Sequence, residues 1–332
     1  MQQNSLGTLF DVSALTLGGG GIGQVWGETT QEEAVATVHE AYNGGVTFFD
    51  MAPMYGDGEA ERVLGLAFAD GYPDGVRVTT KCMIGPVAPD DIEARLTESL
   101  RVSCERLRRE HIDVFILHGF IIPDGWQAAT RPAVVPHIAI ERSIYTNVVV
   151  PVFESWIVSG RISAFGVTAA SITESNLGVL ADETAPSVVQ CIANVLDSPG
   201  NMAISDETPD PRSVISSAHD AGIGVMGIRA VAAGALATAI DREVKPHSAE
   251  ARDFQRAAAF RTFAADSSVS PAALAHRYAL SMPGVDTVVL GVKNREELNE
   301  CLQAEAASRF SPTEMNDIDA LVRQGEWRGT GQ

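Results

Sequence analysis

The sequence predicts a (β/α)8 barrel, a closed ring of eight parallel strands wrapped by helices, with extended loops on its C-terminal face. Three observations support this: strand-like runs alternate with helical stretches, the alternation occurs eight times, and it fills nearly all of the 332 residues. Continuous apolar strands separated by helices indicate a parallel sheet covered on both faces. Because eight such units are typical of this barrel, we expect residues 1–332 to form one (β/α)8 domain.

The predicted strands are short β-branched or aliphatic runs. They are Leu15–Leu17, Val46–Phe49, Val76–Thr80, Val114–Leu117, Ile162–Val167, Ser187–Cys191, Gly224–Ile228 and Asp286–Leu290.

The stretches between the strands have helical length and periodicity. Thr30 and Glu33 have the spacing of a capping box that opens the first helix. In the third helix, one face carries Ile92, Leu96, Leu100 and Leu107. Two further helices are expected at 294–307 and 312–323.

Three connections are longer than the few residues usual between a strand and the next helix: Gly119–Glu141, Asn194–Pro211 and Arg229–Ala249. Long loops in compact domains are usually functional or disordered. All three follow strands, so in a barrel they stand on the C-terminal face. There they are placed to wall a substrate pocket, above all through residues 121–135.

The composition is ordinary for a globular protein, with 45% hydrophobic and 20% charged residues. A net charge of −19 argues against binding to nucleic acid or to an anionic membrane surface. We find no apolar run of the roughly 18 residues that a transmembrane helix needs, and no secretory signal.

Neither the cysteines nor the histidines have the spacing of metal ligands. We therefore expect no metal site, and reduced, mostly buried thiols in a cytoplasmic protein. The cysteines are Cys82, Cys104, Cys191 and Cys301.

Polar residues stand at or just after the ends of the second, third and fourth strands. Asp50 and Tyr55 follow the second strand, Lys81 ends the third, and His118 ends the fourth. In a barrel these strand ends converge on one rim, which is where barrel enzymes carry out their chemistry. Any one of them alone is more often structural, but their joint placement predicts a catalytic site.

The four residues are chemically coherent. A tyrosine phenol has an ordinary pKa near 10, and a neighbouring Lys81 ammonium is expected to lower the pKa of Tyr55. Asp50 is expected to hold that lysine charged and in place. His118 is expected to donate a hydrogen bond that orients and polarises a carbonyl group. Such a site exchanges a proton with a developing alkoxide but has no reductant of its own, so a cofactor must supply the reducing equivalent.

These residues lie in segments that resemble the signatures of the aldo-keto reductase superfamily. The resemblance spans about residues 10–305, and its segments are Phe49–Gly56 with Glu61 and Leu64-Gly65, Leu100 to His118, Gly160–Val167, Val189-Gln190 and Gly291–Asn294. It implies that Tyr55 is the general acid/base, assisted by Asp50, Lys81 and His118.

The resemblance also implies cofactor contacts. Gln190 and Thr168 match positions that hold the nicotinamide carboxamide, in a site that Asp50 borders. Lys293 and Asn294 match the loop that binds the adenosine phosphate end. Because a cation suits the extra 2′-phosphate, Lys293 favours NADP(H) over NAD(H).

The chain departs from the family pattern at several of these positions. Thr168-Ala169 replaces a frequent Ser-Asn pair. Ile228, followed by Arg229, replaces the aromatic residue that stacks on the nicotinamide. Glu297 and Cys301 stand where glutamine and asparagine are frequent near the adenine, and an acid at Glu297 weakens a phosphate site.

The run Gly18–Gly23 fits the G-x-G-x-x-G pattern of a Rossmann dinucleotide site. That motif needs a helix that starts at the glycines. Here Gln24–Glu28 intervenes, and the capped helix is expected near Thr30. In a barrel the glycines, Gly20 among them, are expected to let the backbone approach the cofactor closely; a plain flexible turn is the alternative.

The predicted function is reversible reduction of an aldehyde or ketone by NAD(P)H, with a small-molecule carbonyl or alcohol as substrate. Trp26, Met54 and Phe120 lie in loops beside the four residues, where they line the substrate pocket or pack against other loops. Two other functions stay open: a non-catalytic, nicotinamide-binding redox-sensing subunit, and a lyase or isomerase that uses Lys81 as a Schiff base. The sequence leaves the substrate, the direction of reaction and the oligomeric state undetermined.

Overall fold

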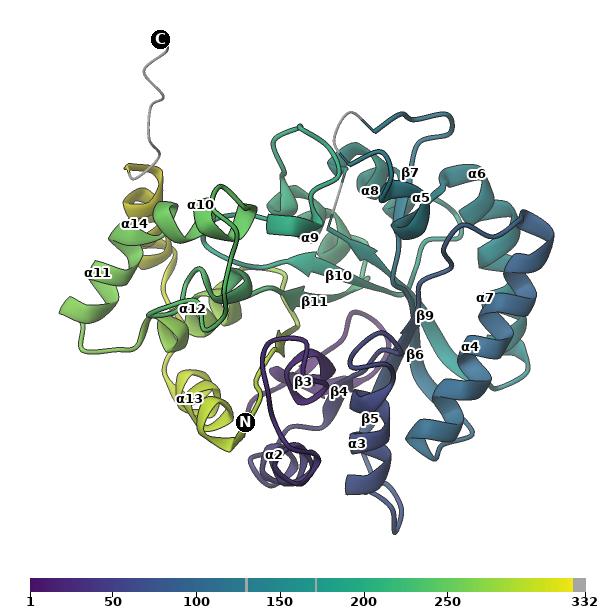
Figure 1. The fold of residues 1–332 in the computed structure, drawn as a ribbon, viewed down its shortest axis with the longest axis horizontal. Helices are drawn as coiled ribbons and strands as arrows, with labels where there is room; N and C mark the ends of the chain where they lie inside the picture. Colours follow the sequence, from purple (N-terminus) through teal and green to yellow (C-terminus); the bar gives the residue numbers. More distant parts are fainter. Residues whose placement is uncertain (129–130, 171, 325–332) are drawn as a thin grey trace.

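The chain folds into a closed barrel of parallel strands, shown by a computed structural model that describes residues 1–128, 131–170 and 172–324 (Figure 1). The strands follow one another around the barrel in chain order, and pairing of the last with the first closes it. The predicted fold class is therefore confirmed, and each predicted strand is found within two residues of its expected ends. The barrel strands are β3 (Leu15–Gly18), β4 (Phe48–Asp50), β5 (Arg77–Cys82), β6 (Ile112–Leu117), β9 (Ile162–Ala169), β10 (Val188–Ile192), β11 (Gly224–Ile228) and β12 (Thr287–Leu290).

Helices surround the barrel (Figure 1). The predicted apolar face of the third long helix is confirmed, because Ile92, Leu96, Leu100 and Leu107 are all buried. Both predicted C-terminal helices are present. The helices of eight or more residues are α2 (Gln31–Asn43), α3 (Glu59–Ala67), α4 (Ile92–Leu107), α7 (Val150–Val158), α8 (Thr173–Leu180), α9 (Pro211–Asp220), α10 (Ala249–Arg256), α11 (Ala258–Asp266), α12 (Pro271–Ser281), α13 (Arg295–Ala306) and α14 (Pro312–Gln324).

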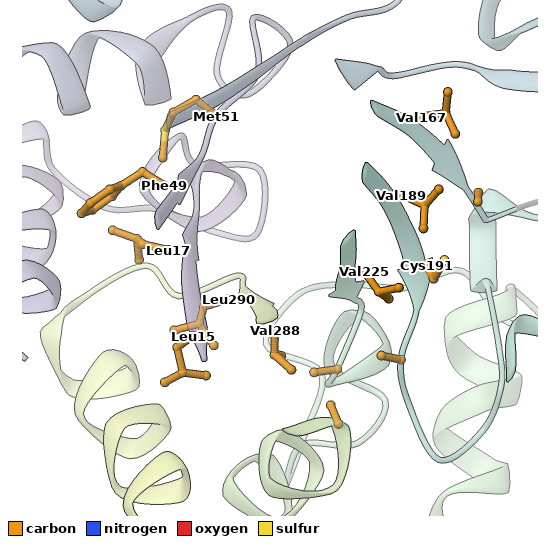
Figure 2. Close-up of a cluster of buried hydrophobic side chains, with 14 of the residues drawn as sticks. Leu15, Leu17, Phe49, Met51, Val167, Val189, Cys191, Val225, Val288 and Leu290 are labelled. Atoms are coloured by element: carbon orange, nitrogen blue, oxygen red, sulfur yellow. The ribbon is translucent and has the colours of Figure 1, made fainter. Parts of the chain in front are cut away.

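The alternation of side chains along each strand divides them between the inside and the outside of the barrel. In β4, Phe49 belongs to the large apolar cluster between the strands and the helices, whereas Phe48 belongs to a separate cluster within the barrel. Figure 2 shows part of the outer cluster, including Leu17, Phe49 and Val189, between the barrel strands and the helices. This alternation directs the side chain of Asp50 inward, like that of Phe48.

An N-terminal hairpin closes one end of the barrel. Strands β1 (Gln3–Ser5) and β2 (Asp11–Ser13) pair antiparallel, and Leu6, which follows β1, and Val12, in β2, are fully buried. These two side chains pack in the inner cluster with Phe48, Val114, Ile116, Ala164, Val188 and Met226. The interior beside the hairpin is thus filled mainly by apolar side chains, together with the buried hydroxyls of Thr16 and Thr287, which hydrogen-bond to each other at 2.6 Å.

The long connections stand at that C-terminal end, as predicted. The first contains β7 (Phe120–Ile122), α5 (Val135–Ile138) and β8 (Ala139–Glu141), with β7 and β8 paired in a small sheet. Its residues 129–130 lie outside the described residues, as do 325–332 of the predicted domain. The other two connections contain the short helices η3 (Gly200–Met202) and η4 (Ala232–Gly234).

Two local predictions need correction. A one-turn helix, α1 (Gly19–Ile22), does begin at the glycine run, although the long helix α2 follows Thr30 as expected. Gly20 packs closely against a side chain, because a Cβ atom on it would lie 2.5 Å from Nε1 of Trp26. The capping box is half formed: Thr30 accepts a hydrogen bond from the amide of Glu33, but the carboxylate of Glu33 binds Arg295 instead.

Three of the four thiols are buried, and Cys104 is partly buried, as expected. Among the described residues, no helix is long and apolar enough to cross a membrane.

The N-terminal hairpin is expected to contribute strongly to stability. Leu6→Ala should lower the free energy of unfolding by about 3 kcal/mol, because it removes a fully buried side chain from a closed cluster. Leu66→Ala, at a leucine with 38% exposure, serves as the matched control and should change it by less than about 1 kcal/mol. Urea denaturation of both variants measures this, and equal losses would contradict the role given to the hairpin.

Candidate active site

A buried ion pair lies at the C-terminal end of the barrel. Asp50 ends β4 and is 2% exposed, and Lys81 lies near the end of β5 and is 0% exposed. The ammonium Nζ of Lys81 is 2.8 Å from Oδ1 of Asp50 and also donates to the carbonyl oxygen of Met51 at 2.9 Å. The cost of burying a charge is thereby offset by a short ion pair and a further hydrogen bond.

Asp50 is fixed by two further hydrogen bonds. Its Oδ1 accepts from Oγ1 of Thr79 at 2.6 Å and from Nε2 of Gln190 at 3.0 Å. These donors come from β5 and β10, on either side of the barrel interior. A carboxylate held by several donors keeps its charge and its orientation.

Tyr55 and His118 complete the cluster on its outer side. The hydroxyl of Tyr55 lies 3.4 Å from Nζ of Lys81 and 3.5 Å from Nε2 of His118. The rings of Tyr55 and His118 meet edge to face, with centroids 5.6 Å apart. Both residues are partly exposed, unlike Asp50 and Lys81. The four predicted catalytic residues therefore lie together.

The protonation states differ in one respect from the sequence-based prediction. Burial raises the pKa of the Tyr55 phenol above its ordinary value, and the Lys81 charge opposes this shift without cancelling it. The predicted lowering effect of Lys81 on this pKa is therefore present, but the pKa is raised overall because desolvation is the larger effect. Burial also disfavours the charge of Lys81, but Asp50 and Tyr55 outweigh it and raise the pKa of that ammonium.

His118 is held neutral. Burial, assisted by the positive charge of Lys81, puts the pKa of the imidazole well below its ordinary value. A neutral imidazole carries one N–H donor and one acceptor nitrogen. At neutral pH the cluster thus presents a protonated phenol and a neutral imidazole to the same space.

Two further polar side chains line this end of the barrel. Gln190 uses its amide Nε2 to bind Asp50, which leaves the carbonyl oxygen of the amide as an acceptor. Thr168, at the neighbouring position of β9, donates from Oγ1 to the carbonyl oxygen of Leu117 at 3.3 Å. Both are nearly fully buried. They offer acceptors for the N–H groups of a carboxamide.

Lys293, Asn294 and Glu297 lie around the N-terminus of α13, after β12. Nζ of Lys293 is 2.5 Å from Oδ2 of Asp241 and 2.6 Å from Oε1 of Glu297. Asn294 caps the helix by accepting from the amide of Glu297. The predicted free cation at Lys293 is therefore an ammonium held between two carboxylates.

The Aldo/keto reductase family model matches residues 14–323, which include all four residues of the cluster. This chain belongs to the aldo/keto reductase family. The membership and relatives named as oxidoreductases support an oxidoreductase activity.

Related proteins align over most of this family member. It is 24% identical to an L-galactose dehydrogenase of Arabidopsis thaliana, over 88% of this chain and 84% of that protein. It is 23% identical to the uncharacterized oxidoreductase YqkF of Bacillus subtilis, over 98% and 97% of the two chains. A solved structure, a glycerol dehydrogenase from Gluconobacter oxydans, has the same fold, with a TM-score of 0.71, 19% identity and coverage of 98% and 96%.

Ile228 and Arg229, which were predicted beside the nicotinamide, lie in different surroundings from one another in this aldo/keto reductase. Ile228 is partly buried against an apolar cluster that includes Phe120 and Ile192. Arg229 has a positive φ of 61°, and its guanidinium lies against Gly200 and donates to Asn201 at 3.3 Å. Nε and Nη2 of Arg229 are buried without a hydrogen-bond partner among the described residues.

The three residues predicted to line the substrate pocket differ in exposure and in packing. Met54 is 53% exposed beside Tyr55, whereas Phe120 is only 5% exposed and packs in the apolar cluster that borders Ile228. Trp26 packs over Gly20, and the guanidinium of Arg242 lies 5.4 Å from its ring centroid. Gly20 therefore contacts the indole of Trp26. Met54 is the most accessible of the three.

Some residues of the site were not predicted from the sequence. Thr79 precedes Lys81 by two positions, so strand alternation is a signal that points it to the same side. The contacts of Asp241 and Glu33 with the loop after β12 have no such signal in the sequence, because both residues lie far from that loop along the chain. Among the described residues, no group of three or more His, Cys, Asp or Glu side chains is arranged to hold a metal ion.

The neutral state of His118 has a testable consequence for stability. Below about pH 6.5 an unfolded histidine takes up a proton that the folded site resists, since the pKa of His118 is lowered. Wild type should therefore lose about 1 kcal/mol of unfolding free energy relative to His118→Gln between pH 7.5 and pH 5.5. Urea denaturation at both pH values measures the difference. A constant difference would show that His118 titrates as in an unfolded chain.

Proposed function

We propose that this protein is a cytoplasmic enzyme that reversibly reduces an aldehyde or ketone with a nicotinamide coenzyme, and that residues 1–332 form its single domain. The observation that carries the proposal is the position of the Tyr55 hydroxyl, within 3.5 Å of both Lys81 and His118 and partly exposed. A protonated phenol is thus available to a bound molecule at a site where its conjugate base would be stabilised.

Tyr55 acts as the proton donor. As the carbonyl carbon is reduced, the carbonyl oxygen gains negative charge and takes the phenolic proton, so that an alcohol and a phenolate form. The phenolate faces the Lys81 ammonium, whose charge is secured by Asp50. In the reverse direction the phenolate accepts the proton of the alcohol.

His118 orients the substrate. Its low pKa keeps the imidazole neutral, so it donates a hydrogen bond to the carbonyl oxygen rather than competing with Tyr55 as an acid. Because Nε2 of His118 lies 3.5 Å from the hydroxyl of Tyr55, we assign both groups to the same carbonyl oxygen. Trp26, Met54 and Phe120 are the side chains that we assign to the surrounding pocket for a small carbonyl or alcohol substrate.

The residues present suit a nicotinamide coenzyme, which supplies the hydride when bound. The free amide carbonyl of Gln190 and the hydroxyl of Thr168 are the acceptors that a carboxamide needs. We assign Ile228 to the nicotinamide ring, Gly20 and Arg229 to the neighbouring part of the coenzyme, and the loop of Lys293, Asn294 and Glu297 to its adenosine end. The preference for NADP(H) predicted from the sequence depends on the cation of Lys293, and that ammonium pairs with Asp241 and Glu297.

Schiff-base chemistry at Lys81 is disfavoured. An amine must be neutral to attack a carbonyl group, but the pKa of Lys81 is raised by Asp50 and Tyr55, and the side chain is fully buried.

Two relatives are named for polyhydroxylated molecules, L-galactose and glycerol. Sugars and polyols are therefore the first substrates to screen, together with apolar carbonyl compounds.

Replacement of Tyr55 tests the proposal. Tyr55→Phe should lower kcat at least about 100-fold, because it removes the proton donor, while the dissociation constant of the coenzyme stays within about threefold. Turnover of a carbonyl panel and coenzyme binding by fluorescence titration measure the two quantities.

Tyr42→Phe is the matched control. Tyr42 lies in α2, packs against Phe68 and is not part of the cluster of Asp50, Tyr55, Lys81 and His118. Its turnover should equal that of wild type. Near wild-type turnover in Tyr55→Phe would remove Tyr55 from the mechanism.

A further inference from the structure

The ammonium of Lys293 is paired with two carboxylates, so it is not free to bind a phosphate. Its Nζ lies between Asp241 at 2.5 Å and Glu297 at 2.6 Å, and its side chain is 16% exposed. Hydrogen bonds to both carboxylates outweigh partial burial and raise the pKa of Lys293, and its ammonium in turn contributes to a lowered pKa at Asp241. Two carboxylates thus face one ammonium, so the formal charge of the three groups is negative.

Three backbone amides around the start of α13 are also occupied. The amide of Lys293 donates to Oε2 of Glu297 at 2.8 Å, and that of Arg295 donates to Oε1 of Glu33 at 3.1 Å. The amide of Glu297 donates to Asn294 at 2.9 Å. A helix N-terminus ordinarily attracts anions through such amides. Here carboxylates and an amide side chain of the protein itself already take that place.

The neighbouring guanidinium groups are similarly engaged. Arg295 pairs with Glu33 at 2.9 Å. Arg242 lies 3.6 Å from Oδ1 of Asp241, donates to the carbonyl oxygen of Ala233 and faces the ring of Trp26. Around this loop the carboxylates are those of Asp241, Glu297 and Glu33, and the cations that they pair with are Lys293, Arg242 and Arg295. The three negative charges thus balance the three positive charges. A phosphate dianion placed here would have to displace a carboxylate from its partner.

We propose that Asp241 and Glu297 make this enzyme select NAD(H) over NADP(H). Their carboxylates accept hydrogen bonds from the hydroxyl groups of the adenosine ribose, and they repel a phosphate on its 2′ oxygen. The inference rests on the proposed function, which puts the adenosine end of the coenzyme at this loop. It reverses the preference for NADP(H) that the sequence suggested, because that preference treated Lys293 as a free cation.

Binding measurements test this without reliance on turnover. Tryptophan fluorescence titrations of the full-length protein with NAD⁺, NADP⁺, AMP and adenosine 2′,5′-bisphosphate give four dissociation constants. Wild type should bind NAD⁺ at least about tenfold more tightly than NADP⁺, and AMP more tightly than the bisphosphate. The double variant Asp241→Asn, Glu297→Gln keeps the shape of both side chains. It should bind NADP⁺ about tenfold more tightly than wild type does, since Lys293 is released.

Glu296→Gln is the control for net charge. Glu296 lies in the same first turn of α13 and is exposed, and it lacks the contact with Lys293 that Glu297 makes. The control removes one negative charge but should leave the ratio of the two dissociation constants within about twofold of wild type. Circular dichroism of each variant verifies that the fold is kept.

The outcomes separate the two proposals. Tighter binding of NADP⁺ than of NAD⁺ by wild type, or an equal shift in Glu296→Gln and the double variant, would overturn the assignment of Asp241 and Glu297 while leaving the reductase proposal intact. Failure of wild type to bind either dinucleotide would refute the proposed function, and the selectivity with it.

Discussion

The ion pair between Asp50 and Lys81 is the interaction on which the remainder of the site depends. A fully buried ammonium is tolerated only where a carboxylate and further acceptors surround it. Asp50, the carbonyl of Met51 and the hydroxyl of Tyr55 provide those partners, and Thr79 and Gln190 hold Asp50 in turn. The charge that stabilises a phenolate is therefore fixed by β4, β5 and β10 together.

The barrel explains why these residues meet although they are far apart in the sequence. Parallel strands bring their C-terminal ends to one rim, where these polar side chains lie, whereas an apolar cluster fills the interior on the side of the N-terminal hairpin. On the same rim, the loop after β12 joins α13, where Lys293 and its carboxylates lie. In the proposed function, this one end of the barrel carries both the chemistry and the selection of the coenzyme.

Regular structure was predictable from the sequence because its signals are periodic. The strand-end positions of Asp50, Lys81 and His118 follow from the alternation of strands and helices, and their meeting follows from barrel closure. The net pKa of Tyr55 was not predictable, because it depends on how deeply the phenol is buried. The partner of Lys293 was not predictable either, since Asp241 stands 52 residues away in an irregular loop and tertiary contacts of such loops leave no periodic signal.

A double-mutant cycle on the buried pair tests the central claim most directly. The free energies of unfolding of wild type, Lys81→Met, Asp50→Asn and the double variant give the coupling energy between the two side chains. Each single variant should lose about 3–5 kcal/mol because it leaves a polar partner buried without compensation, and the coupling should be at least about 2 kcal/mol. Additive losses, within about 0.5 kcal/mol, would contradict the account.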